Sequence, residues 1–193
     1  MSKLIAITAP SGAGKTTIVR HLLATYDELA FSVSATNRKK RDHEIDGKDY
    51  YFLSTREFKK RIKNGDFLEW EEVYENQFYG TLKSEIERIW EDGKNIVFDI
   101  EVKGATNIKK MYPGEQSMVV FISPPSLETL IKRLKNRKTE SAQSFKKRVA
   151  RVKEEMTYEN NFDKILVNDV LEIALKEAEL MIEDFLGLQA TEE

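Results

Sequence analysis

Short apolar runs along this chain alternate with segments whose apolar residues recur at helical spacing. Leu4–Thr8 is an apolar run that leads into a glycine-rich loop, and a helical stripe follows from Lys15 onward. Ile96–Phe98 and Met118–Ile122 lack polar alternation, which is typical of parallel strands covered on both faces, and Lys164–Val167 is the last such run. The pattern also predicts a second strand at Phe31 and Val33 and helices over 127–134 and 171–185. Such alternation predicts a doubly wound parallel α/β sheet.

Two segments interrupt this alternation. The first, 34–83, is polar and aromatic, with strand-like pieces at Asp49–Leu53 and Phe67–Val73 and a helix near Glu57–Lys63. The second, 124–158, is basic and helical. The chain has no internal repeat or low-complexity linker, so we predict a single domain over 1–193. Its core is 1–33, 84–123 and 159–193, with an inserted lobe at 34–83 and a helical lid at 124–158.

Composition excludes several kinds of site. The 193 residues include no cysteine and only two histidines, His21 and His43. A disulfide framework, a thiolate zinc site, a cysteine nucleophile and a histidine-rich metal site are therefore excluded. No apolar run approaches the ~20 residues of a membrane span, and the N-terminus lacks a signal-sequence pattern. We expect a soluble, cytoplasmic protein with no membrane partner.

The charge is nearly balanced but unevenly distributed. The net charge of −2 argues against binding a nucleic acid polymer through bulk charge. Between Ile131 and Lys153, however, ten Lys or Arg residues accompany one acid, Glu140. A local basic segment in a nearly neutral protein indicates a small polyanionic ligand, although a solvated helix face would give the same pattern.

The loop after the first apolar run has the features of a phosphate-binding loop. Gly12 and Gly14 permit torsions that let successive N–H groups face one anion, and the following helix adds its positive end. Lys15 can bridge the β- and γ-phosphates of a triphosphate, and Thr16 can offer its hydroxyl to Mg²⁺. The predicted ATP-binding loop comprises Ala9, Pro10, Ser11, Gly12, Ala13, Gly14, Lys15, Thr16 and Thr17. Ala9 stands where the strict motif has Gly, and the alternative is a glycine-rich turn that binds nothing.

Acidic residues follow the apolar run at Ile96–Phe98. The carboxyl end of a strand beside the phosphate loop is where a carboxylate that organises magnesium belongs, so Thr16 and Asp99 are the predicted Mg²⁺ ligands. Asp99 and Glu101 alternate with Ile100 and therefore project from the same side. The alternative is that Asp99 only caps the helix that follows.

Several further motifs resemble those of guanylate kinases. The resemblance rests on Thr36–Phe52, Phe67–Trp70, Tyr79–Thr81, Asp99–Glu101 and Val167–Asp169, which occur in the family's order and at nearly its spacing. It covers essentially the whole chain. It implies a P-loop fold with a GMP-binding lobe and a lid, and the reaction ATP + GMP → ADP + GDP with Mg²⁺, in purine nucleotide metabolism and GMP recycling.

The acceptor site is implied by the resemblance and agrees with the chemistry of its residues. Arginine forks suit a phosphate, tyrosine hydroxyls can donate to it, and a carboxylate can accept from the adjacent N1–H and amine of guanine. The implied base contacts are Ser34, Glu69, Thr81 and Glu101; the phosphate contacts are Arg38, Arg41, Tyr50 and Tyr79; Glu44 and Asp99 complete the GMP site. Each residue alone has a plainer interpretation, such as a solvated basic loop, a rim aromatic or a surface strand position.

The basic lid supplies the remaining predicted residues. The resemblance implies that Arg137 and Arg148 clamp the transferring phosphoryl group, that Arg133 stacks on adenine, and that Asn168 contacts the adenine side. The predicted catalytic set is Lys15, Arg38, Arg137 and Arg148. Lys146, Lys147 and Arg151 are predicted to be solvated surface.

The sequence also departs from the family pattern. Asn37, Lys40 and His43 replace residues common in the family, and Glu101 replaces an Asp, which leaves its contact with guanine open. Two other classes of function remain: a non-catalytic interaction module of the same fold, and a kinase for another acceptor such as a sugar phosphate. GMP and dGMP are both open as acceptors, as are a monomer and a homodimer.

Overall fold

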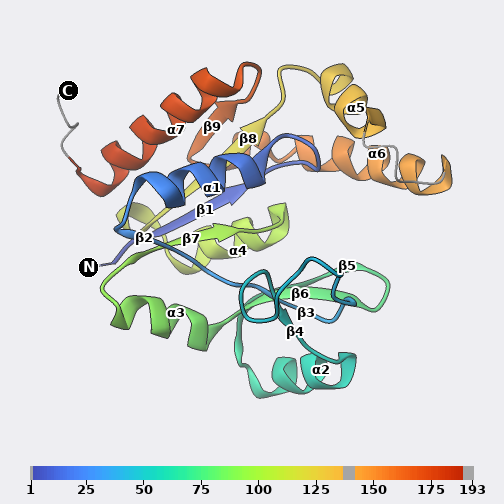
Figure 1. Ribbon diagram of the computed structural model, residues 1–193, viewed down its shortest axis with the longest axis vertical. Coiled ribbons are helices and arrows are strands. Elements are labelled where there is room, and N and C mark those ends of the chain that lie inside the picture. Colours follow the sequence, from blue (N-terminus) through green and yellow to red (C-terminus); the bar gives the residue numbers. More distant parts are fainter. Residues whose placement is uncertain (1, 137–141, 189–193) are drawn as a thin grey trace. The chain divides into compact units, whose positions relative to one another are not determined.

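The computed structural model describes residues 2–136 and 142–188 (Figure 1). The strands are β1 Leu4–Thr8, β2 Leu29–Phe31, β3 Ala35–Thr36, β4 Tyr51–Phe52, β5 Phe67–Tyr74, β6 Gln77–Leu82, β7 Asn95–Asp99, β8 Ser117–Ser123 and β9 Lys164–Val167. The helices are α1 Lys15–Thr25, α2 Thr55–Asn64, α3 Lys83–Glu91, α4 Val102–Met111, α5 Leu127–Asn136, α6 Ala142–Met156 and α7 Leu171–Leu186, with short 3₁₀ turns at Gly114–Gln116 and Glu159–Asn161.

The strands form two sheets. A five-stranded sheet has the order β2-β7-β1-β8-β9, with parallel pairing of β2 with β7 and of β8 with β9. A separate sheet has the order β4-β3-β6-β5 and is mixed: β3 pairs with β4 in parallel and with β6 antiparallel. The predicted fold class is confirmed.

The chain forms two compact units. Unit 1 comprises Met1–Leu4 and Glu28–Phe98, and unit 2 comprises Ile5–Asp27 and Asp99–Glu193. The predicted lobe at 34–83 lies within unit 1, and the phosphate loop and the predicted lid lie in unit 2.

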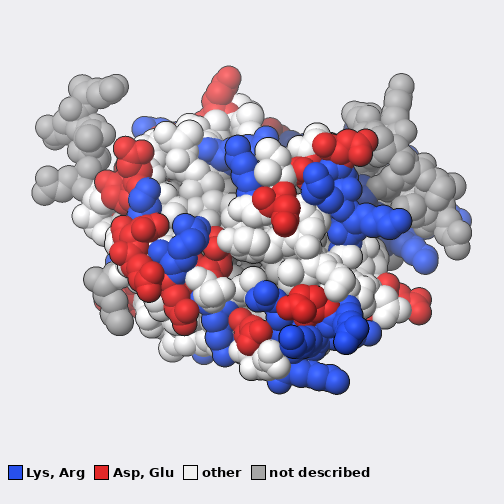
Figure 2. Space-filling view, turned by 60° about the horizontal axis from the view of Figure 1, so that its bottom comes forward, with Lys and Arg blue, Asp and Glu red and all other residues white. Residues whose placement is uncertain are grey.

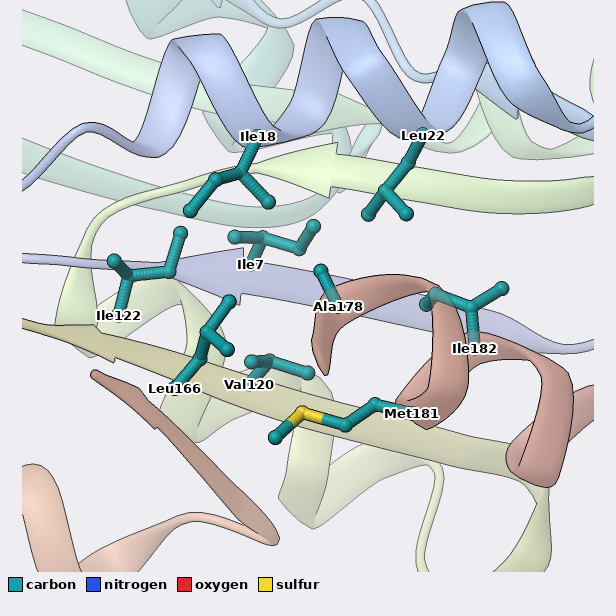
Figure 3. A pocket seen from close by; sticks show the side chains of 9 residues that line it. All are labelled: Ile7, Ile18, Leu22, Val120, Ile122, Leu166, Ala178, Met181 and Ile182. Atoms are coloured by element: carbon teal, nitrogen blue, oxygen red, sulfur yellow. The ribbon is translucent and has the colours of Figure 1, made fainter. Parts of the chain in front are cut away.

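The core of unit 2 lies between apolar strands and helices. All seven residues of β8 are buried, so this strand is covered on both faces. Helix α1 packs against α7, and α4 packs against β8. Figure 3 shows the side chains of Ile7, Val120 and Leu166 pointing toward those of Ile18 and Met181 around a small apolar pocket. Every residue that lines this pocket is apolar, so it is a packing gap in the core and not a polar ligand site.

Two strand predictions are wrong in detail. Strand β9 is at the edge of the sheet, so its faces are not both covered: Leu166 is buried, but Ile165 and Val167 are 39% and 47% exposed. Strand β2 ends at Phe31 and does not reach Val33. The Val33 N–H instead donates to Oε1 of the buried Glu85 (3.0 Å), so a side chain takes the place of the sheet partner.

The small sheet of unit 1 has its own aromatic core. Phe58 of α2 stacks on Phe67 and Phe78, with ring centroids 4.4 and 5.5 Å apart. The α2 helix is longer than the predicted Glu57–Lys63 because Ser54 caps it, accepting from the Glu57 N–H (3.1 Å). These contacts hold β5 and β6 together within unit 1, and three of the predicted acceptor residues, Glu69, Tyr79 and Thr81, lie on those two strands.

Surface properties complete the description of the fold. Among residues 2–136 and 142–188, no helix is long and apolar enough to cross a membrane. On the face shown in Figure 2, basic and acidic side chains are interspersed, as expected from the nearly balanced net charge.

Candidate nucleotide sites

The phosphate loop joins β1 to α1 in unit 2. Gly12 and Gly14 have φ values of 92° and 102°, in the left-handed region that favours glycine. The Ala13 N–H donates to the Pro10 carbonyl (3.1 Å), which closes the turn. Helix α1 has neither a side-chain cap nor an acid in its first turn, so no acidic side chain of that turn opposes an anion at its positive end. Thr16 and Thr17, the next residues, are exposed.

Lys15 is held at the end of β7. Its Nζ lies 2.7 Å from Oδ1 of Asp99 and donates to the Ile100 carbonyl (3.0 Å). The side chains are 16% and 23% exposed, so the ion pair is partly shielded from water. The structure thus brings together the lysine and the carboxylate that the sequence predicted separately. Asp99 is not a cap of α4, because residue 101 is the N-cap of that helix.

Asn168 braces the phosphate loop from the end of β9. Its Nδ2 donates to the Ala13 carbonyl (2.7 Å), and its own carbonyl accepts from Nη1 of Arg133 (3.0 Å). A Cβ at Gly14 would collide with the Asn168 amide, so Gly14 is required for close approach as well as for its φ. Asn168 and Arg133, both predicted on the adenine side, therefore lie together beside the loop.

Arg38 and Glu44 form the centre of the predicted phosphate site in unit 1. The pair is bidentate: Nη1 lies 2.7 Å from Oε2 and Nη2 lies 2.6 Å from Oε1. Glu44 is buried and also accepts from the Arg41 N–H (2.8 Å). The hydrogen bond from Arg38 lowers the pKa of Glu44 from 4.5 to about 2 and raises the pKa of Arg38, so both groups stay charged. Glu44, predicted as a GMP residue, is placed to orient the arginines.

Aromatic rings surround this pair. The Arg38 guanidinium lies 5.0 Å from the ring centroid of Tyr50 and 5.5 Å from that of Phe52. The rings of Tyr50 and Tyr79 meet edge to face at 5.9 Å, and the Tyr79 hydroxyl accepts from Gln77 (2.8 Å). The structure therefore brings Arg38, Tyr50 and Tyr79 into one cluster, as the phosphate prediction requires.

Glu69 and Thr81 form a buried polar pair between β5 and β6. The Thr81 hydroxyl donates to Oε1 of Glu69 (2.7 Å). Thr81 is 0% exposed and Glu69 is 7% exposed. Their strands are paired in register at these two residues. Burying a carboxylate costs free energy of desolvation. Glu69 is buried, so the plainer interpretation of this residue as a surface strand position does not apply.

The other predicted residues have diverse positions. Ser34 is half-buried beside β3 and Arg41 is exposed, while Arg148 is half-buried on α6. Arg137 lies outside the described residues. Lys146 and Lys147 are exposed, as predicted.

The prediction that Arg151 is solvated surface is wrong. Its side chain is 23% exposed; Nη2 lies 3.0 Å from Oε2 of Glu101, and Nε lies 2.7 Å from Oε1 of Glu155. Glu155 is buried, and burial raises its pKa. The four-residue spacing of Arg151 and Glu155 indicated that they could pair on one helix face. Nothing in the sequence indicated the contact with Glu101, which is 50 residues away.

Asn37 is a second residue whose contacts the sequence did not predict. Its amide donates to Thr55 Oγ1 and to the Asn76 carbonyl, both at 2.8 Å, and its Oδ1 accepts from the Phe78 N–H (2.7 Å). It therefore fixes the segment before Arg38 to α2 and to the β5–β6 hairpin. Asn37, which departs from the family pattern, therefore joins three segments of unit 1 by hydrogen bonds.

The donor set at the phosphate loop fits Mg²⁺. Thr16 offers an exposed hydroxyl, and Asp99 offers a carboxylate that contacts the Lys15 ammonium. Mg²⁺ prefers oxygen ligands and usually keeps water and substrate phosphates with only one or two protein ligands. Within the described part of the chain, no group of three or more histidine, cysteine, aspartate or glutamate residues could hold a metal ion.

A phosphate loop after the first strand of a parallel sheet, together with a second sheet that presents paired arginine and carboxylate groups, defines a P-loop nucleoside monophosphate kinase. Residues 1–185 match the family model described as guanylate kinase. A guanylate kinase of Bacteroides fragilis is 46% identical over 187 residues, covering 97% of this chain and 91% of the relative. One of Salinibacter ruber is 48% identical over 184 residues, covering 95% and 97%.

A solved structure gives the same result. The crystal structure of guanylate kinase from Anaplasma phagocytophilum superimposes with a TM-score of 0.74 at 25% identity, covering 95% of this chain and 85% of that one. The chain belongs to the guanylate kinase family. Its activity is the transfer of a phosphoryl group from ATP to GMP, which gives ADP and GDP.

Proposed function

We propose that the two units divide the substrates between them, with ATP at the phosphate loop of unit 2 and GMP, or dGMP, at the small sheet of unit 1. The observation that carries this proposal is the presence of two separate sets of anion-binding groups. One is the helix N-terminus after Gly14, and the other is the Arg38 cluster, which includes Tyr79 of β6. The Glu69–Thr81 pair, which could read a base, lies on the same β5–β6 hairpin as Tyr79.

At the phosphate loop, we assign the triphosphate to residues 9–17. Backbone N–H groups after Gly12 and Gly14 surround the β-phosphate, and Lys15 moves from its contact with Asp99 to the β- and γ-phosphates. Thr16 and Asp99 would hold Mg²⁺, which when bound neutralises charge on the phosphate oxygens. Arg133 and Asn168 lie on the adenine side, and Arg137 and Arg148 bind the transferring group.

At the small sheet, we assign recognition of the guanine base to a carboxylate. Glu69 accepts from the N1–H and exocyclic amine of guanine, donors that adenine does not present together. Thr81 holds Oε1 of Glu69, and Ser34 and Glu101 complete the polar edge of the base. Arg38, Arg41, Tyr50 and Tyr79 bind the phosphate, with Glu44 and Asp99 in supporting positions.

The reaction needs alignment and charge neutralisation and no general base. An anionic oxygen of the GMP phosphate attacks the γ-phosphorus, a new P–O bond forms, and the bond to the β-phosphate oxygen breaks to release ADP. Two polyanions must be held in line, and the cationic side chains of the two sets reduce their repulsion. Closure of the 34–83 lobe and the 124–158 lid would exclude water and limit hydrolysis of ATP.

The test is a coupled assay of ADP release with GMP, dGMP, AMP, UMP and CMP as acceptors. We expect activity with the guanine nucleotides and at least about 10²-fold lower efficiency with the others, because mismatched donors would leave Glu69 unpaired. Equal rates with AMP would contradict the guanine assignment, and no ADP release with any acceptor would favour an interaction module. The family and its substrates lead us to propose action in the cytoplasm, as a monomer or homodimer.

A further inference from the structure

A buried carboxylate lies where the small sheet of unit 1 is joined to the rest of that unit. Glu85, in the first turn of α3, is 3% exposed. Its Oε1 accepts from the Val33 N–H (3.0 Å) and from Nη2 of Arg88 (2.8 Å). Its Oε2 accepts from the Tyr51 hydroxyl (2.9 Å) and from Nε of Arg88 (3.1 Å). The four lone-pair positions of the carboxylate are therefore all used within unit 1, and Glu85 is not among the proposed nucleotide ligands.

This network keeps Glu85 charged and Tyr51 protonated. Burial raises the pKa of Glu85, but the hydrogen bonds from Arg88, the Val33 N–H and Tyr51 outweigh it and hold that pKa below its ordinary value. Burial and the hydrogen bond to Glu85 raise the pKa of Tyr51. The Tyr51 hydroxyl thus donates to an ionised carboxylate, which makes a stronger hydrogen bond than a neutral acceptor would. Arg88 lies on α3 itself, so Val33 and Tyr51 are the donors that tie Glu85 to other segments.

Tyr51 joins β4 to the segment before β3 through its backbone and its side chain. Its N–H donates to the Ser34 carbonyl (2.9 Å), and its ring packs against the apolar cluster that includes Phe58. Since Glu85 binds both the Tyr51 hydroxyl and the Val33 N–H, the contacts close a ring through these segments. Strand β4 has two residues and lies at the edge of the small sheet, so few ladder hydrogen bonds hold it. The contact with Glu85 is therefore a substantial part of what fixes its position.

The residues on either side of Tyr51 lie at the proposed phosphate site. The ring centroids of Tyr50 and Phe52 are 5.0 and 5.5 Å from the guanidinium carbon of Arg38. Successive side chains of an extended segment point to opposite faces, so Tyr51 extends toward the apolar cluster while its two neighbours extend toward Arg38. A displacement of Tyr51 would therefore move Tyr50 and Phe52 relative to the arginine.

We propose that Glu85 is a positioning residue of the acceptor site, which holds β4 through the Tyr51 hydroxyl so that Tyr50 meets the phosphate of GMP. This inference rests on the proposed binding of that phosphate by the Arg38 cluster. Glu85 acts through Tyr51 and does not itself contact the nucleotide.

The test removes the tie without removing a ligand. Tyr51→Phe keeps the ring and its packing and leaves the other three hydrogen bonds of Glu85 in place. We expect it to raise the KM for GMP about 5- to 10-fold while kcat and the KM for ATP stay within about 2-fold, because one charge-assisted hydrogen bond is lost. Glu85→Gln, which keeps the side-chain size but places an amide donor opposite donors, should give the same split between KM and kcat.

The matched control is a tyrosine–glutamate hydrogen bond in unit 2. The Tyr26 hydroxyl donates to Oε1 of Glu183 (2.7 Å), and this pair is also partly buried. Tyr26→Phe removes the same kind of bond, so thermal melts of the two tyrosine variants should be similar. Its KM for GMP should stay at the wild-type value, which separates positioning of the acceptor site from a general loss of stability.

Guanosine and a double-mutant cycle show whether the effect reaches the phosphate through Tyr50. Guanosine lacks the phosphate, so its inhibition constant should change less than about 2-fold in Tyr51→Phe. In a Tyr50→Phe background, Tyr51→Phe should raise the KM for GMP by less than about 2-fold, because the hydroxyl that it positions is already absent. An unchanged KM for GMP in Tyr51→Phe, or equal losses with GMP and guanosine, would overturn the proposal and leave the kinase function intact. A wild-type enzyme with no GMP-dependent ADP release would instead overturn the proposed function.

Discussion

In the small sheet of unit 1 the proposed ligand groups are side chains that already have partners, whereas at the phosphate loop of unit 2 they are mainly backbone N–H groups. Arg38 is held by Glu44 and aromatic rings, and Glu69 is held by Thr81. The loop is shaped by Gly12 and Gly14, and its principal side chain is Lys15.

The difference has a physical consequence. A pre-paired side chain is oriented before the ligand arrives, but the loss of one partner leaves the other buried and uncompensated. A backbone site depends little on side-chain identity, except where glycine is needed or where a charge meets the transferring group. The acceptor cluster should therefore be sensitive in both stability and specificity, and the phosphate loop mainly in rate.

The largest effect is expected at Lys15. Lys15→Met removes the cation that contacts the phosphates, so transition-state stabilisation should fall by about 3–4 kcal/mol or more, or several hundred-fold in kcat. The rate of ADP release and a thermal melt measure it, with Lys110→Met at an exposed position of α4 as the control. A well-folded variant with a near-normal rate would contradict the assignment of the loop.

Glu44→Gln tests the pre-paired character of the acceptor cluster. Since the folded pKa of Glu44, about 2, lies below its ordinary value of 4.5, the ionised group stabilises the fold above pH ~5, and that contribution is lost as pH falls toward 2. The difference in unfolding free energy between wild type and variant should be about 3 kcal/mol at neutral pH and should narrow below pH 5. Urea titrations from pH 7 to 2.5 measure it.

The exposed Asp42, in the same loop as Glu44, provides the control. Asp42→Asn should show a much smaller, nearly pH-independent difference. If both variants gave the same pH dependence, the Arg38–Glu44 pair would not be the source of the stabilisation.

Glu69→Gln tests the guanine reader. The amide places donors opposite the donors of guanine, so kcat/KM for GMP should fall about 10²-fold with little change in the KM for ATP. Steady-state kinetics with each substrate varied in turn measure it. Glu75→Gln, in the exposed turn of the same hairpin, should leave both values unchanged, and an unaffected GMP efficiency in Glu69→Gln would assign the reading of guanine elsewhere.

The smallest effect is expected at the partner of Glu69. Thr81→Val keeps the side-chain volume but removes the hydroxyl that donates to Glu69, so GMP efficiency should fall about 10-fold. Thr81→Ser should recover most of the loss because it restores the donor. Equal kinetics of the Val and Ser variants would show that the hydroxyl does not orient Glu69.

By itself the sequence determined the fold class, and it predicted the phosphate loop and, through the family resemblance, the acceptor residues. These features are local: a strand followed by glycines and a lysine, or motifs with fixed spacing, carry their chemistry in neighbouring residues. The i,i+4 spacing of Arg151 and Glu155 was also local, but it could not distinguish a buried pair from a solvated one.

Only the tertiary structure decided which charges meet. Lys15 contacts Asp99 across 84 residues of sequence, Arg151 contacts Glu101, and Asn168 reaches the carbonyl of Ala13. The exposure of Ile165 and Val167 likewise follows from the position of β9 at the sheet edge. Burial and long-range pairing depend on which segments the fold brings together, and the order of strands in a sheet is not encoded in the pattern of any single segment.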